Sequence, residues 1–179
     1  MIETLISSKT RIKLLLKFFL NSNTTSYLRG LEGDLGDSSN AIRLELNALE
    51  KAGMLSSFLS GNKKMFRANT QHPLFNEIHS IILKQVGIDR IVENVIERLG
   101  EVESVYLVGE FARGLDSPII DLVFVGDIDK KYLVELVEKV EKLIRRKIRY
   151  LIYGKFEYEL LGNIPSDSTS FLVWQKEIF

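Results

Sequence analysis

Residues 110–126, EFARGLDSPIIDLVFVG, hold a tight glycine-containing turn that runs into an apolar strand. One carboxylate, Asp121, interrupts the Ile, Leu, Val and Phe side chains of that strand. Two carboxylates spaced two residues apart on a strand project from the same face and can together hold a pair of metal ions. Position 119, two residues before Asp121, is Ile. The stretch therefore predicts a sheet strand that supplies only one of the two carboxylates that such a metal site needs.

The residues on either side of this stretch follow an α/β pattern. An apolar strand is predicted over 104–109, before it, and an amphipathic helix over 130–146, after it. A third strand, KIRYLIYG, follows at 147–154, so the order is strand, strand, helix, strand. For the tail we predict one or two short helices around Pro165 and a packing role for Trp174.

Asp121 raises a problem of charge. Its strand neighbours Ile119, Val123 and Val125 share its face, because alternate residues of a strand point the same way. A carboxylate in apolar surroundings needs a partner, and we expect Arg113 to supply it.

The N-terminal half predicts three helices and a hairpin. The helices are expected over 7–21, 26–36 and 37–53 from apolar residues at helical spacing. The first and third begin behind polar capping residues, and Gly33 and Gly36 end the second. The third ends at Gly53, where a left-handed residue commonly closes a helix. The hairpin follows, with its strands on either side of Gly61-Asn62, a pair that suits a two-residue turn.

The third of these helices resembles the recognition helix of winged-helix regulators related to the ArsR group. The matching residues of SSNAIRLELNALEKAGML, at 38–55, are Ile42, Arg43, Glu45, Leu46, Leu49, Ala52 and Gly53. The resemblance implies a winged helix-turn-helix whose third helix enters the major groove of duplex DNA. The exposed candidates for DNA binding are Ser39, Asn40, Arg43 and Asn47 on the helix, with Lys63 and Lys64 on the wing.

Another interpretation of this half stays open. Winged helices also bind proteins, and exposed Arg, Asn and Lys side chains usually form a solvated face. Glu45 and Glu50 lower the positive potential of the same helix.

The C-terminal half resembles the minimal nucleotidyltransferase family over about Leu99 to Tyr153. In LVGEFARGLDSPIIDLVFVG, at 107–126, the matching residues are Gly109, Ala112, Arg113, Gly114, Asp121, Leu122 and Gly126. The family places Ser where this chain has Glu110, and carboxylates where it has Ile119 and Arg149. With the carboxylates missing, we predict a degenerate nucleotide pocket of Gly109, Glu110, Arg113 and Asp121, no metal or cofactor, and no enzyme activity.

Together the halves predict an α+β protein similar to prokaryotic regulators that join a winged helix to a nucleotidyltransferase-like domain. The expected parts are a winged helix-turn-helix over 1–70, a helical connector over 71–98, and a small α/β nucleotidyltransferase-like domain with a mixed sheet over 99–179. The predicted function is a DNA-binding transcriptional regulator, expected to be a homodimer, whose second domain serves dimerisation, ligand sensing or partner binding. The alternatives are an active nucleotidyltransferase and an antitoxin-like, protein-binding module.

Composition agrees with a soluble globular chain of 179 residues, with 45% apolar and 27% charged residues. Residues 1–70 hold 10 Lys and Arg against 6 Asp and Glu, whereas residues 71–179 hold 14 against 18, so the N-terminal half is the one suited to a polyanion.

The absence of cysteine and of a long apolar stretch predicts a cytoplasmic protein that does not enter a membrane. His72 and His79 lack a third ligand at metal-binding spacing.

Overall fold

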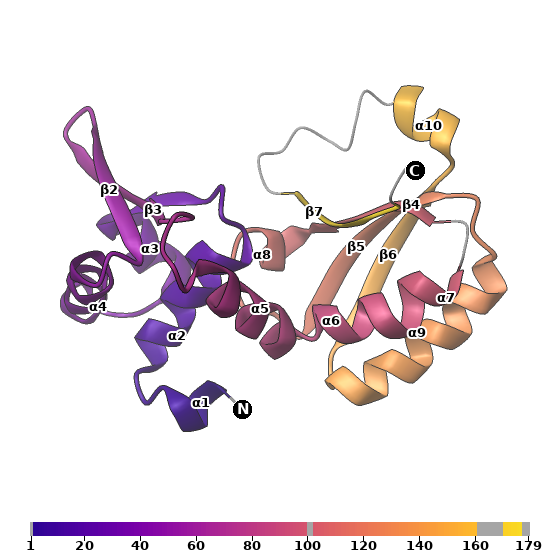
Figure 1. The fold of residues 1–179 in the computed structure, drawn as a ribbon, viewed down its shortest axis with the longest axis horizontal. Coiled ribbons are helices and arrows are strands. Elements are labelled where there is room, and N and C mark those ends of the chain that lie inside the picture. The colour runs from indigo at the N-terminus through magenta and orange to yellow at the C-terminus, as the bar shows by residue number, and fades with distance from the viewer. Residues whose placement is uncertain (1, 100–101, 161–169, 177–179) are drawn as a thin grey trace. The chain divides into compact units, whose positions relative to one another are not determined.

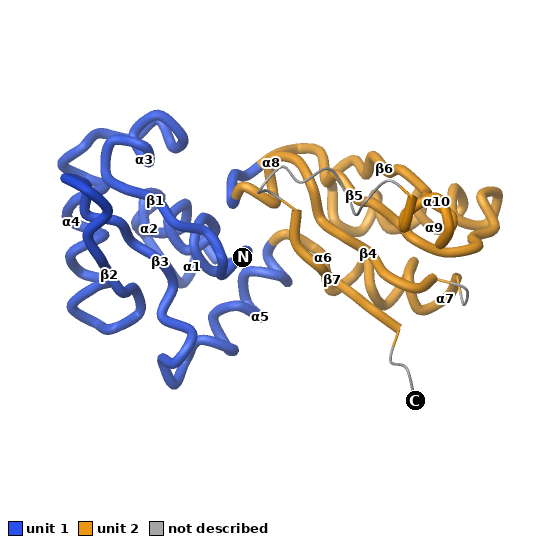
Figure 2. Tube along the Cα trace, turned by 90° about the horizontal axis from the view of Figure 1, so that it is seen from above, with its two compact units in different colours: residues 1–85, 114–116 blue, residues 86–113, 117–179 orange. Residues whose placement is uncertain are grey.

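The computed structural model describes residues 2–99, 102–160 and 170–176, and the predicted α+β class with a mixed sheet is confirmed (Figure 1). The chain forms two compact units. Unit 1 contains residues 1–85 and 114–116, and unit 2 contains residues 86–113 and 117–179 (Figure 2). The predicted connector, 71–98, is therefore divided between the two units. No described helix is long and apolar enough to cross a membrane.

Unit 1 consists of helices around a small antiparallel sheet with the strand order β1-β3-β2. In chain order its elements are α1 (Ile2–Leu5), α2 (Lys9–Leu15), the π-helical turn η1 (Leu16–Leu20), β1 (Thr25–Tyr27), α3 (Leu28–Leu35), α4 (Ser39–Lys51), β2 (Leu55–Ser60), β3 (Lys63–Ala68) and α5 (Phe75–Val86). The core of this unit includes Phe18, Phe19, Leu31, Ile42, Leu46 and Phe66, which are all buried.

The predicted helices of unit 1 are confirmed, and their caps explain where they begin. The Ser8 hydroxyl accepts a hydrogen bond from the Arg11 amide at the start of α2, and Ser38 caps α4 in the same way through the Ala41 amide. Lys17 departs from the exposure that is usual for lysine. Its side chain is buried and its ammonium lies 2.7 Å from the carboxylate of Asp34.

The hairpin of unit 1 is also confirmed. Gly61, with a φ of +59°, and Asn62 form the two-residue turn between β2 and β3. The short strand β1, which sequence reasoning missed, pairs with the other side of β3 and brings Ser26 opposite Phe66. The hairpin thereby supplies two strands of a three-stranded sheet, with β3 in the middle.

Unit 2 is a four-stranded mixed sheet with the order β6-β5-β4-β7, in which β5 and β6 are parallel and the other pairs antiparallel. In chain order its elements are α6 (Ile88–Ile91), the π-helical turn η2 (Val92–Ile96), α7 (Glu97–Leu99), β4 (Val102–Val108), α8 (Gly109–Ala112), β5 (Ile119–Gly126), α9 (Lys130–Ile144), β6 (Lys147–Tyr153), α10 (Lys155–Leu160) and β7 (Phe171–Gln175).

The two faces of this sheet differ in what lies on them. The helices α6, α7 and α9 lie on the same side of the sheet (Figure 1). By the pairing register, the buried residues Leu107 and Leu122 share one face of the sheet. Asp121 lies on the opposite face, with Val108 and Arg149.

The described part of the tail is a helix and a strand, which lie before and after the predicted short helices around Pro165. The residues around Pro165 lie outside those that the structure describes. Before them the chain forms α10, and after them it forms the strand β7, in which Trp174 pairs with Val105 of β4. A strand that pairs with a segment 70 residues away leaves little local signal in a sequence.

Candidate functional site

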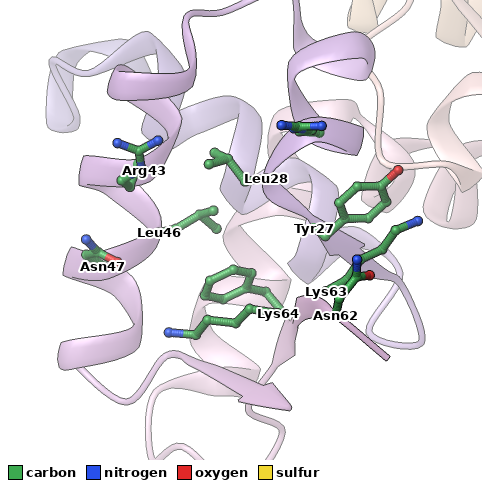
Figure 3. A pocket seen from close by; sticks show the side chains of 10 residues that line it. Tyr27, Leu28, Arg43, Leu46, Asn47, Asn62, Lys63 and Lys64 are labelled. Atoms are coloured by element: carbon green, nitrogen blue, oxygen red, sulfur yellow. The ribbon is translucent and has the colours of Figure 1, made fainter. Parts of the chain in front are cut away.

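A hollow of about 580 Å³ lies in unit 1 between α4, the start of α3 and the hairpin (Figure 3). Apolar side chains form part of its wall and polar or charged ones the rest. The lining residues are Tyr27, Leu28, Arg29, Arg43, Leu46, Asn47, Asn62, Lys63, Lys64 and Phe66. Four of these ten side chains are cations and none is an acid, so the hollow attracts anions.

The four cations differ in how far they are engaged. Arg29 and Arg43 are exposed, and within the described part of the chain neither makes an ion pair. The Lys63 ammonium lies 4.3 Å from the centre of the Tyr27 ring, and the Lys64 ammonium lies 2.7 Å from a carboxylate oxygen of Glu50. The two arginines are therefore the cations with most charge left for an external partner.

Glu45 does not reduce the charge of the hollow, although it lies on α4. Its carboxylate accepts hydrogen bonds from the Ser8 hydroxyl at 2.6 Å and from the Arg11 guanidinium at 2.7 Å, and so ties α4 to α2. Burial raises the pKa of the Glu45 carboxyl, but these two hydrogen bonds outweigh it and leave the pKa below its usual value. Glu45 is thus a structural residue of unit 1.

Glu50 connects α4 to the hairpin. Its carboxylate accepts hydrogen bonds from the Lys64 ammonium and the Ser57 hydroxyl, and these lower the pKa of the Glu50 carboxyl. The contact holds β2 and β3 against the C-terminal part of α4. It also neutralises part of the charge of Lys64.

The structure brings together four of the six residues predicted to bind DNA. Arg43 and Asn47 of α4 face Lys63 and Lys64 of the hairpin across the hollow (Figure 3). Ser39 and Asn40 lie in the first turn of α4 and do not line the hollow. Sequence reasoning missed Arg29, Tyr27 and Asn62. Arg29 lies in the first turn of α3, and no local pattern in the sequence marks it as a lining residue.

A second hollow, of about 300 Å³, lies in unit 2 beside Asp121. It is lined by Val108, Gly109, Asp121, Leu122, Arg149, Tyr150 and Leu151. Gly109 has a φ of +68°, and a Cβ atom at this position would lie 2.5 Å from Oδ2 of Asp121. The turn after β4 therefore needs glycine both for its backbone conformation and to let the carboxylate approach.

The predicted pairing of Asp121 with Arg113 is wrong. The guanidinium of Arg149 donates to the Asp121 carboxylate, which raises the pKa of Arg149 further. The parallel register of β5 and β6 sets the two residues directly opposite each other, whereas Arg113, which ends α8, lies 3.1 Å from Glu110 one turn earlier. Of the four residues predicted to form a pocket, Gly109 and Asp121 line the hollow and Glu110 and Arg113 do not.

The residues present do not fit a two-metal site. Among the described residues, no three His, Cys, Asp or Glu side chains are grouped so that they could hold a metal ion. Asp121 is the one carboxylate that lines the hollow of unit 2, and Arg149 already holds it. The two histidines have local roles: a ring nitrogen of His79 lies 2.6 Å from the Phe19 carbonyl oxygen, and Nδ1 of His72 accepts from the Leu74 amide.

Comparisons with known proteins find similarity among solved structures. No family model and no curated protein matches the chain. A complex of a tri-AMPylated Shewanella oneidensis HEPN toxin with an MNT antitoxin is 13% identical, over 52% of this chain and 73% of that one, with a TM-score of 0.37. A candidate nucleotidyltransferase of Sulfolobus solfataricus is 26% identical, over 55% of this chain and 86% of that one, with a TM-score of 0.38. A toxin–antitoxin structure with AMP-PNP is 13% identical, over 53% and 76%, with a TM-score of 0.37.

These similarities contradict the prediction that the chain is not an enzyme. The solved chains are described as a nucleotidyltransferase, or as parts of complexes that hold an AMPylated toxin or AMP-PNP. The prediction rested on the carboxylates missing at positions 119 and 149, and on Glu110 in the place of a serine. Loss of those carboxylates does not by itself decide whether the chain carries out a reaction, and we do not retain the prediction.

Proposed function

We propose that unit 1 is a winged helix-turn-helix that binds duplex DNA, with α4 as its recognition helix and the β2–β3 hairpin as its wing. The order of its elements, a helix, a short strand, two helices and a hairpin, supports this proposal. The observation that carries it is the cationic hollow between α4 and the hairpin, with its four cations and no lining acid.

The roles of the lining residues follow from their chemistry. Arg43 and Asn47 lie four residues apart on the exposed face of α4, where a guanidinium can pair with guanine and an amide with adenine. Arg29, Lys63 and Lys64 border the hollow from other elements and are suited to backbone phosphates. Ser39 and Asn40, in the first turn of α4, would lie nearest the floor of the groove.

The test is fluorescence anisotropy of the full chain on duplex DNA from upstream of its own gene, with random duplex as competitor and at several salt concentrations. Preference for the upstream duplex, with a salt slope near that of three or four phosphate contacts (about −3 to −4 for B-DNA), supports the proposal. Equal and weak binding of both duplexes at low salt, unchanged in Arg43→Ala, would reject it.

Such a regulator would act as a homodimer. Two copies of α4 related by two-fold symmetry would read half-sites about one helical turn apart. Light scattering of the free chain and of its DNA complex checks this. A mass of one chain per duplex would exclude the homodimer while leaving DNA binding intact.

A second candidate function is nucleotidyl transfer by unit 2. The observation that favours it is the glycine turn at Gly109, which brings the backbone against a carboxylate in an open hollow. Transfer would move a nucleotidyl group from a nucleoside triphosphate to a protein or small-molecule acceptor and release pyrophosphate. Incubation with α-labelled nucleoside triphosphates is the test. Label that the wild-type chain transfers and Asp121→Asn does not would support it, and no transfer from any nucleotide would reject it.

The other proposal for unit 2 is that it binds a protein partner, as an antitoxin-like module would. It predicts that the chain forms a complex of defined stoichiometry with a protein encoded by a neighbouring gene. Co-expression followed by size-exclusion chromatography tests it, and separate elution of the two proteins would reject it.

A further inference from the structure

Three large side chains form a row across the three-stranded sheet of unit 1. They lie on its outer face, which is the face directed away from α4. Tyr27 of β1 is paired with Met65 of β3, which is in turn paired with Phe58 of β2. Residues directly opposite each other on neighbouring strands share a face, so the three side chains lie side by side. On the other face of the same strands, Leu55 and Phe66 are buried in the core.

This outer sheet face is open and carries positive charge. Phe58 is 40% exposed, and the residues on either side of the row on β3, Lys63 and Arg67, are exposed cations. Counted from the pairing register, the described side chains of the face are Thr25, Tyr27, Ser56, Phe58, Ser60, Lys63, Met65 and Arg67. None of these eight is an acid, so the face favours a polyanion.

The two cations already lie over the two rings. The Lys63 ammonium is 4.3 Å from the centre of the Tyr27 ring, and the Arg67 guanidinium carbon is 5.5 Å from the centre of the Phe58 ring. At exposed sites such contacts are weak, and a base that stacks on an aromatic ring gains more. A base could therefore displace each cation from its ring and leave it beside the adjacent phosphate.

We propose that the outer sheet face of unit 1 binds single-stranded nucleic acid, with bases stacked on Tyr27 and Phe58 and phosphates held by Lys63 and Arg67. Strands in a sheet are about 4.8 Å apart, so the two ring-bearing residues are about 10 Å apart, with Met65 between them. An exposed sheet that presents aromatic rings flanked by cations can stack two or three unpaired bases in this way. Duplex DNA offers no such bases.

The surface is separable from the hollow that is proposed to bind duplex DNA. Tyr27 and Lys63 border both, but Phe58 and Arg67 do not line the hollow, and Arg43 does not lie on the outer sheet face. Variants at Phe58 and Arg67 therefore test this inference alone, and Arg43→Ala tests the duplex proposal alone.

The experiment is fluorescence anisotropy of the full chain with labelled oligothymidylate and oligouridylate of about 12 nucleotides, which suits one small stacking surface. The double variant Phe58→Leu, Arg67→Gln is expected to weaken oligonucleotide binding at least about fivefold, while its affinity for duplex DNA stays within about twofold. Phe58→Trp, which keeps a ring, should retain the affinity. Phe156→Ala, which removes an exposed ring from α10 of unit 2, is the matched control.

The outcomes separate this inference from the duplex proposal. Loss of oligonucleotide binding in the double variant, with retention in Arg43→Ala, supports the inference whether or not duplex DNA binds. Equal affinities of Phe58→Leu and Phe58→Trp would overturn it, because stacking would then play no part. Failure of the wild-type chain to bind either oligonucleotide at low salt, or equally tight binding of polyglutamate, would overturn it as well.

Discussion

The two hollows of this protein both contain arginine, but they differ in what the arginine faces. In unit 1, Arg29 and Arg43 are exposed and make no ion pair in the described part of the chain. In unit 2, Arg149 is directed at Asp121, which is only 9% exposed. A buried carboxylate is costly unless it is paired, so the charge of Arg149 is compensated within the fold. Unit 1 therefore leaves two arginines open to the external anion that we propose, whereas Arg149 pairs within its own domain.

The largest expected effect is on the free energy of unfolding, at the turn where Gly109 lies against Asp121 in the second hollow. Gly109→Ala places a Cβ atom 2.5 Å from Oδ2 of Asp121 in a left-handed conformation, so we expect unfolding free energy to fall by about 3 kcal/mol. Urea unfolding followed by circular dichroism measures it. Gly33→Ala is the matched control, because a Cβ atom there meets nothing within 4 Å, and it should be neutral or stabilising by up to about 1 kcal/mol. Equal midpoints for the two variants would refute the account of the turn.

The next effect concerns Arg43, one of the two arginines of the first hollow that make no ion pair among the described residues. Arg43→Ala should weaken binding to the specific duplex about 30-fold, or about 2 kcal/mol, because a guanidinium that reads a base is lost. Anisotropy titration at fixed salt measures the change. Arg98→Ala removes an exposed arginine from α7 of unit 2 and should leave the affinity unchanged. A similar loss in both variants would mean that net charge alone is responsible.

A smaller effect is expected when Lys64 of the hairpin is released from its ion pair with Glu50. Glu50→Gln frees Lys64 from its ion pair, so we expect duplex binding to tighten at low salt and the salt slope to become steeper by about 1. The slope of log Kd against log salt concentration is the quantity to compare. Glu135→Gln, on the exposed side of α9, is the control for the loss of one negative charge. An unchanged slope in Glu50→Gln would show that Lys64 does not contact phosphate.

The smallest effect concerns the carboxylate that ties α4 to α2. The pKa of Glu45 in the folded chain lies below its usual value of about 4.5, so its contribution to stability is present above that pH and is lost as the pH falls through the folded pKa. Glu45→Gln should therefore cost about 1 kcal/mol at neutral pH and progressively less below about pH 4. Thermal unfolding across this range measures it. A cost that does not change with pH would mean that the ionised carboxylate is not responsible.

The elements that sequence predicted well are those with strong local signals. The helix α4 has a serine cap, three buried residues at helical spacing and a glycine stop, and the hairpin has Gly61-Asn62 between two strands. The strands β1 and β7 were missed, because each is short and acquires its structure by pairing with a distant segment. Local pattern carries no information about such pairing.

Only part of each candidate site was predicted, because a local pattern shows which residues of a helix are exposed but not which strands pair. The exposure of Arg43 and Asn47 was predicted correctly, because helical spacing shows which face of α4 is exposed. The partner of Asp121 was not found, because it depends on the register between two parallel strands with a whole helix between them in sequence. The burial of Lys17 could not be predicted either, because it depends on an ion pair with Asp34, 17 residues away in sequence.

The measurement that tests the central claim most directly is the salt dependence of duplex binding for the wild-type chain, Arg43→Ala and Arg98→Ala side by side. The account predicts that the wild type and Arg98→Ala prefer the upstream duplex to random duplex with the same steep slope, and that Arg43→Ala loses the preference. No preference in the wild type, or a preference that survives Arg43→Ala, would contradict the claim that the hollow between α4 and the hairpin reads DNA.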